Sequence, residues 1–155
     1  MGKKKRIALA ILLCIICDIL IFLVVPDERP ENYTLNVTME SDEKGIYQFF
    51  YSQNGIFEMD KMQQYSYENV GEKEQLSFEV PASCMNWRLD FGDAKASVKI
   101  YSMELEHKNS THKLDYAVIQ NSSDKHSIGS ITEKGDYLEI NVESDDPRCI
   151  LDVPE

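Results

Sequence analysis

The sequence predicts an all-β protein: an antiparallel β-sandwich of jelly-roll-like arrangement behind a single N-terminal transmembrane helix. One apolar run near the N-terminus is long enough to cross a membrane. After it come short segments in which apolar and polar residues alternate, separated by turn-forming residues. This pattern is typical of an antiparallel sandwich. The predicted parts are a cytoplasmic basic cap, a transmembrane anchor, a stalk and one β-sandwich domain, at residues 1–6, 7–25, 26–31 and 32–155.

The predicted anchor runs from Ile7 to Val25 and ends before Pro26. An apolar helix of this length just crosses a hydrocarbon core of about 30 Å. Four basic residues, Lys3 to Arg6, precede it, so the positive-inside rule predicts a cytoplasmic N-terminus and a domain outside the cell membrane. The alternative is a cleaved signal peptide, but the sequence after the run contains no small-x-small cleavage site. We therefore expect an uncleaved, single-pass anchor.

Asp18 is the one charged residue within the apolar run. A carboxylate at this depth costs a few kcal/mol on insertion scales unless it is paired, protonated or close to an interface. Two explanations stay open. Asp18 either shifts toward the outer interface or becomes protonated, or it contacts a polar group on a helix of a multi-span membrane partner.

The segment from Asp27 to Glu155 has the size of one domain and carries 12 basic and 26 acidic residues, a net charge of −14. Such a charge excludes nucleic acid and anionic lipid surfaces as favourable partners. Cys84 and Cys149 are the two cysteines of this segment. They could form one disulfide bond, or remain as two buried free thiols.

The alternating segments are each five to nine residues long. The switch of parity between Ile100 and Met103 in one of them predicts a bulge or a bend. Residues 56–70 are ambiguous between a short helix and an irregular crossing, and residues 107–113 read as a polar loop. The predicted strands are 33–39, 46–52, 75–81, 87–91, 97–105, 114–120, 127–131, 137–142 and 149–153.

Four short motifs carry a resemblance to a known family: Phe50-Tyr51, the run from Arg88 to Gly92, the strand from Ile100 to Leu105, and Asp146-Pro147. In this order they resemble an extracytoplasmic β-sandwich segment of bacterial membrane proteins and glycosyltransferase-associated proteins of cell-surface polysaccharide assembly. The resemblance implies the fold, a bacterial cell-envelope location and an association with polysaccharide. It implies no catalytic residues.

Arg88 and Asp90 are two residues apart on a predicted strand, so both point away from the face that carries Trp87, Leu89 and Phe91. They form either an exposed ion pair of little energetic value or a fixed polar patch that orients a sugar or a neighbouring segment. A further alternative is a calcium site that uses Asp90 and Asp93, although their spacing does not match a dense calcium loop.

Aromatic side chains are the natural candidates for sugar binding, because sugar rings pack on flat side chains while polar groups fix their orientation. Strand alternation explains Phe57, Tyr65 and Tyr67 least well. These three residues are therefore candidates for ligand binding, with core packing or a covering role as the alternative.

Chemistry that would require a metal or cofactor has little support in the sequence. His107, His112 and Asp115 could form a zinc site, but loop histidines in solvent explain the first two equally well. No nucleophile with its base, pair of carboxylates or phosphate-binding glycine loop stands out. We expect a non-enzymatic binding or interaction module without metal or cofactor, linked to envelope glycan assembly. The alternative is a protein-interaction subunit that docks on a multi-span partner through its anchor helix.

Overall fold

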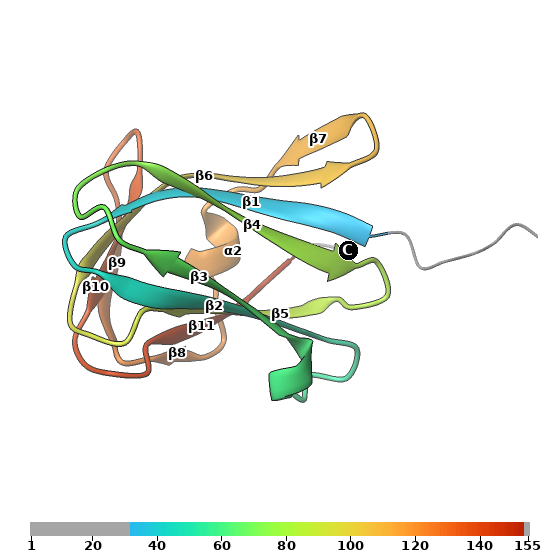
Figure 1. The fold of residues 1–155 in the computed structure, drawn as a ribbon, viewed down its shortest axis with the longest axis horizontal. Helices are drawn as coiled ribbons and strands as arrows, with labels where there is room; N and C mark the ends of the chain where they lie inside the picture. Colours follow the sequence, from blue (N-terminus) through green and yellow to red (C-terminus); the bar gives the residue numbers. More distant parts are fainter. Residues whose placement is uncertain (1–31, 154–155) are drawn as a thin grey trace, which may run out of the picture. The chain divides into compact units, whose positions relative to one another are not determined.

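The computed structural model describes residues 32–153, which fold into two antiparallel sheets packed face to face (Figure 1). The predicted all-β sandwich is confirmed. The predicted basic cap, anchor with Asp18, and stalk lie outside the described residues. Between residues 32 and 153, no helix has the length and apolar character needed to cross a membrane.

The first sheet has the strand order β4-β1-β6-β10-β9, and β7 pairs with the end of β6. Its strands are β1 (Asn32–Ser41), β4 (Glu74–Pro81), β6 (Ser97–His107), β7 (Ser110–Lys113), β9 (Ile128–Glu133) and β10 (Leu138–Val142).

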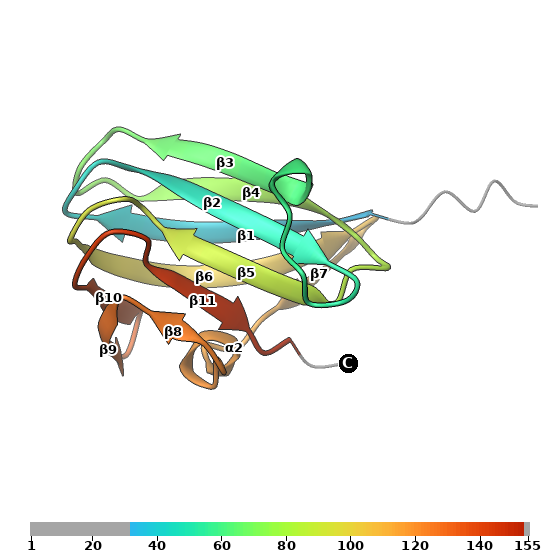
Figure 2. The same ribbon diagram turned by 90° about the horizontal axis from the view of Figure 1, so that it is seen from below.

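The second sheet has the order β3-β2-β5-β11-β8. Figure 2 shows β8, β9 and the short helix α2 on the side of the sandwich opposite β3. The strands of this sheet are β2 (Gly45–Ser52), β3 (Met62–Tyr67), β5 (Asn86–Phe91), β8 (Lys125–His126) and β11 (Arg148–Leu151), and the helical turns are η1 (Met59–Lys61) and α2 (Ala117–Gln120).

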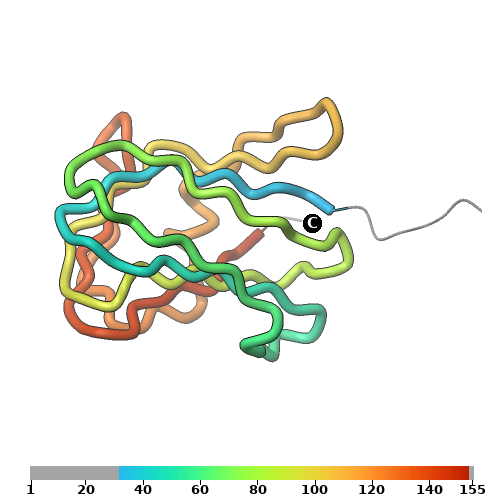
Figure 3. The backbone as a smooth tube through the Cα atoms, in the orientation of Figure 1, coloured from blue at the N-terminus to red at the C-terminus, as the bar shows by residue number. Residues whose placement is uncertain are grey.

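The chain passes repeatedly from one sheet to the other, as the tube in Figure 3 shows. Strands β2 and β3 pair in the second sheet, and β4 then returns to pair with β1 in the first. This is a Greek-key connection divided between the two sheets. It brings the edge strands β3 and β4 to the same side of the sandwich, where they belong to different sheets.

Aromatic residues from both sheets form the centre of the core. The ring of Phe49 in β2 stacks on that of Phe78 in β4 with 5.1 Å between centroids, and it meets Trp87 edge-on at 5.9 Å. All three side chains are almost completely buried. The period-two alternation of the sequence therefore marks the inward faces correctly, because successive residues of a strand point to opposite sides.

The predicted bulge in the segment 97–105 is confirmed. Thr38 pairs with Ser102, but the next residue of β1, Met39, pairs with Ile100. Tyr101 is thus the extra residue of β6. The bulge lets Val98, Ile100 and Met103 all face the core, although the spacing changes between the last two.

Three segments differ from the prediction. The strand predicted at 114–120 is wrong: the Asp115 carboxylate accepts a hydrogen bond from the Ala117 N–H at 2.8 Å, and α2 begins there, so local turn chemistry prevails over alternation. The ambiguous segment 56–70 contains η1 and the strand β3. The polar loop 107–113 is mostly a hairpin of β6 and β7, with Lys108 at a positive φ of 54° in its turn.

The disulfide considered from the sequence does not form, since Cys84 and Cys149 are both buried free thiols. Cys149 in β11 pairs with Leu89 of β5. Leu89 lies three residues, or about 10 Å, along the strand from its first residue Asn86, and Cys84 precedes that residue. A disulfide requires Cα atoms within about 7 Å. The register of β11 on β5 therefore keeps the two thiols apart.

Candidate functional site

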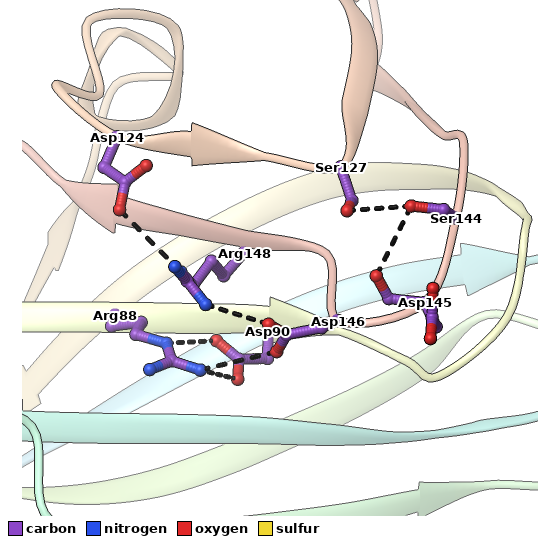
Figure 4. A network of polar contacts seen from close by, with 8 residues as sticks. All are labelled: Arg88, Asp90, Asp124, Ser127, Ser144, Asp145, Asp146 and Arg148. Carbon is purple, nitrogen blue, oxygen red and sulfur yellow. Dashed lines mark hydrogen bonds and ion pairs between the residues drawn. The ribbon is translucent and has the colours of Figure 1, made fainter.

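The Arg88–Asp90 pair lies on the outer face of the second sheet (Figure 4). Arg88 Nε donates a hydrogen bond to Asp90 Oδ1 at 2.7 Å, and Nη2 donates to Oδ2 at 2.5 Å. This is a two-pronged contact between a guanidinium and a carboxylate, which fixes both planes. Asp90 is only 4% exposed, so the pair has a fixed geometry within the sheet and differs from a mobile ion pair on the surface.

Two aromatic rings extend this patch. Phe50 pairs with Arg88 across β2 and β5, and the guanidinium carbon lies 4.5 Å from the centre of its ring. Phe57, from the loop after β2, meets the Phe50 ring edge-on at 6.5 Å. Phe50 points outward yet is only 4% exposed. Phe57 and Arg88 therefore cover Phe50, and three of the residues proposed from the sequence, Phe57, Arg88 and Asp90, belong to one surface.

The ion pairs continue into β11 and the loop before it (Figure 4). Arg148 Nη1 donates to Asp146 Oδ2 at 2.9 Å, and its Nε lies 3.7 Å from Asp124 Oδ2. Asp146 Oδ1 lies 3.9 Å from Arg88 Nη2. This network ties β5, β11, the segment before β8 and the loop before β11 into one fixed polar surface.

Burial governs the electrostatics of Asp90. It raises the pKa of this carboxyl, while the hydrogen bonds and positive charge of Arg88 act in the opposite direction. Both carboxylate oxygens already accept from Arg88, so they are not placed to bind the calcium ion considered with Asp93. Among residues 32–153, no three or more histidine, cysteine, aspartate or glutamate side chains lie close enough together to hold a metal ion. His107, His112 and Asp115 therefore do not form the zinc site considered from the sequence.

Tyr65 and Tyr67, the other two candidates from the sequence, lie on β3 away from this patch. Tyr65 OH donates to Glu74 Oε2 at 2.8 Å, and this hydrogen bond raises the pKa of the phenol. Tyr67 is fully buried, donates to the Glu72 carbonyl at 2.7 Å and accepts from the Ser41 N–H at 3.1 Å. Tyr67 is therefore not accessible to a ligand, because its ring belongs to the core between the sheets.

A second surface, which the sequence did not predict, lies on the outer face of the first sheet. The rings of Tyr101 and Tyr137 are 5.6 Å apart and inclined at 52°. Lys73 Nζ lies 3.4 Å from the centre of the Tyr101 ring, and Lys99 Nζ lies 5.7 Å from that of Tyr137. We call Tyr101 and Tyr137 the tyrosine platform. Both side chains are partly exposed, and Lys73 covers one face of the Tyr101 ring.

Glu40 holds the platform in place. Its carboxylate accepts hydrogen bonds from Lys99 Nζ at 2.6 Å and from Tyr101 OH at 2.7 Å. These two contacts lower the pKa of Glu40, and the Glu40 hydrogen bond raises the pKa of Lys99. Glu40 and Lys99 are also direct neighbours in the pairing of β1 with β6. The sheet register therefore fixes the polar groups around the Tyr101 ring.

A hollow of about 400 Å³ adjoins the platform. Tyr116 OH lies in its wall and donates to the Tyr101 carbonyl at 2.8 Å. Three acidic residues are part of its lining, so it combines tyrosine side chains with hydrogen-bond acceptors. The lining residues are Tyr101, Lys113, Leu114, Asp115, Tyr116, Glu133, Gly135 and Asp136.

The sequence contained one signal for the platform. The change of parity after Ile100 indicates a bulge, and the extra residue of that bulge is Tyr101. A bulge re-aims the side chain that it displaces. The partner ring, Tyr137, comes from the turn before β10, and only the long-range pairing of β10 with β6 brings the two together.

The chain matches no protein-family model, no curated protein and no solved structure.

Proposed function

We propose that this protein is a non-enzymatic, single-pass membrane protein whose β-sandwich lies outside the cell and binds glycan during assembly of the bacterial cell envelope. The location follows from the predicted anchor and its basic cap, with the N-terminus in the cytoplasm. The proposal includes no cofactor, no metal and no nucleic-acid partner. The jelly-roll-like arrangement is also part of it, supported by the nested pairs β1–β6 and β2–β5.

The tyrosine platform carries the proposal. Two partly exposed rings lie side by side, charged groups are held at fixed positions around them, and a hollow adjoins them. Sugar rings bind to such surfaces by packing on aromatic faces, while hydrogen bonds to their hydroxyls set the orientation. The Arg88–Asp90 patch on the opposite sheet has its strongest hydrogen-bonding groups committed to each other. We therefore assign it the role of a rigid support.

The second candidate function rests on Asp18. A charged residue within the apolar run would be stabilised by a polar group on a helix of a multi-span membrane protein. In this case the anchor recognises a partner, and the β-sandwich is the part of an assembly that projects from the membrane.

Glycan binding by the purified full chain in detergent tests the first proposal, with neutral and amino-sugar bacterial polysaccharides as probes. We expect Tyr137→Ala to weaken binding about three- to tenfold, since one aromatic contact contributes about 0.5–1.5 kcal/mol. Tyr65→Ala is the matched control, because this tyrosine is also partly exposed and also bonded to a glutamate, but it lies on β3. Its binding should equal that of the unchanged protein.

The absence of any interaction with polysaccharide would contradict glycan binding, and equal binding by both tyrosine variants would contradict the platform as the binding site. Co-purification of a multi-span protein that is lost in Asp18→Leu, with insertion and folding intact, would then favour the second candidate.

A further inference from the structure

The strand β9 ends the first sheet, and its pairing with β10 determines which of its backbone groups face outward. The Lys134 N–H donates to the Tyr137 carbonyl at 2.8 Å, which makes these two residues a hydrogen-bonded pair. Such pairs alternate along an antiparallel ladder. From the register of β9 and β10, the backbone N–H and C=O of Ile131 and Glu133 therefore point away from β10.

The pairing of β10 with β6, on its other side, confirms which residues of β9 and β10 face each other. The Val142 N–H donates to the Ala96 carbonyl on the β6 side at 2.8 Å. Alternate residues of β10, Glu139 and Asn141, therefore face β9. Within residues 32–153, no other strand and no side chain forms a hydrogen bond to the outward backbone groups of Ile131 and Glu133. The outer edge of β9 is thus a short row of donors and acceptors with the spacing of a strand.

A hollow of about 350 Å³ runs beside this edge. Ile128 and Ile131 line it and are each partly exposed, and Gln120 and Lys125 form its opposite wall. Gly129 adds no side chain; a Cβ there would lie 2.1 Å from Glu143 Oε1. An added strand needs a backbone edge for hydrogen bonds and a recess for its alternate side chains. Here two isoleucines supply the apolar part of a recess whose other lining residues are polar or glycine.

The charge around the edge indicates the chemistry of the occupant. From Ile128 to Glu143, which includes β9 and β10, the chain has four acidic residues and one lysine, and Lys125 adds a second positive charge in the wall of the hollow, so the excess is negative. A second copy would bring the same excess of negative charge to the contact, and like charges across an interface are repelled. We propose that the outer edge of β9 takes up an extended, basic segment of a partner protein as an additional strand.

A capped seven-residue peptide of alternating lysine and valine is the probe, titrated onto the full chain in detergent micelles by fluorescence anisotropy. Glu133→Pro removes an N–H that points outward and leaves the hydrogen bonds of the sheet intact. Edge strands tolerate proline at such positions. We expect this variant to bind at least tenfold more weakly. Glu133→Thr is the matched control, because it removes the same charge and keeps the N–H; its binding should weaken threefold at most.

Hydrogen exchange of the unchanged protein provides a measurement that needs no variant. At saturating peptide, exchange across residues 128–133 should slow at least tenfold, while exchange in β3 stays unchanged. The proposal is overturned if the peptide fails to bind, if Glu133→Pro binds as tightly as Glu133→Thr, or if protection appears elsewhere. If a matched glutamate–valine peptide binds as tightly as the lysine–valine peptide, or if two copies of the chain form a dimer through β9, the proposal that the partner segment is basic is overturned.

Discussion

The two open sides of this sandwich differ in how far side chains occupy the hydrogen-bonding groups of their edge strands. On the side of β3 and β4, side chains connect the two sheets: Gln63 Oε1 accepts from the Glu79 N–H at 2.9 Å, and Gln63 Nε2 donates to the Glu79 carbonyl. Glu74 accepts from Tyr65 OH at 2.8 Å and from Asn69 Nδ2 at 2.7 Å. On the opposite side, the backbone of β9 has no comparable partner among residues 32–153.

The amide of Gln63 reproduces the hydrogen bonds that a neighbouring strand would form with Glu79, and so it occupies part of the β4 edge. An edge closed by such a contact cannot pair with another chain at that point. We call the β3–β4 side the closed edge and the β9 side the free edge. The difference indicates that the closed edge stabilises the domain, whereas the free edge remains available for binding.

The largest expected effect concerns Tyr67, which fixes the closed edge to the core. Tyr67→Ala removes a fully buried ring and two hydrogen bonds, and we expect a loss of about 3–5 kcal/mol in the free energy of unfolding. Urea denaturation measures this loss. Tyr65→Ala should cost less than about 1 kcal/mol, because its hydroxyl bonds at a partly exposed site. Equal losses in the two variants would contradict the division between core anchor and edge contact.

The stability of the protein at alkaline pH depends on two buried ionisable groups, one on each side of the sandwich. Tyr47 contacts Tyr67 near the closed edge, and Cys149 pairs with Lys125 of β8 near the free edge. Burial raises the pKa of Tyr47 from 10.0 to about 12 and that of Cys149 from 9.0 to about 12. A raised pKa in the folded state gives stability that is complete below the unfolded value and is lost as the pH rises. Stability should therefore fall between about pH 9 and 12, by a few kcal/mol.

Urea midpoints at pH 7 and at pH 10.5 measure this loss. The change should be smaller in Cys149→Ala than in the unchanged protein, since the thiol with the lower unfolded pKa titrates first. Tyr47→Phe should matter mainly above pH 10. Constant midpoints up to pH 11 would show that neither group ionises on unfolding as expected.

The fold was largely predictable because it depends on local alternation. The inward positions of β1, β2, β4 and β5 follow from period-two patterns, and the parity change in β6 predicted its bulge. The strand β3 escaped prediction because its sequence, MQQYSY, contains two glutamines and a serine. The pairing of β3 with β2 places Gln63, and its side chain then bonds to Glu79, sixteen residues away in the chain. Alternation of apolar and polar residues carries no information on such a contact.

The candidate sites were predictable only in part. Arg88 and Asp90 share a face because they are two residues apart on a strand. The extension of their network needs Asp146 at a positive φ of 58°, and the register of β11 on β5 brings Arg148 opposite Asp90. The platform likewise needs β10 beside β6, which places Tyr137 near Tyr101. Contacts set by the pairing of distant strands require the three-dimensional structure.

The smallest expected effect tests the closed edge itself. Gln63→Ala removes both hydrogen bonds to Glu79, and we expect a loss of about 1 kcal/mol in the free energy of unfolding. Gln64→Ala is the matched control, because the neighbouring glutamine is exposed and points to the other face of β3. Hydrogen exchange sharpens the comparison: the Glu79 amide should exchange faster in Gln63→Ala alone, and β9 should be unaffected in both variants. If the Glu79 amide stays protected without Gln63, the closed edge is maintained by the packing of Phe78 and Val80, and the contrast between the two sides lies in burial and not in hydrogen bonding.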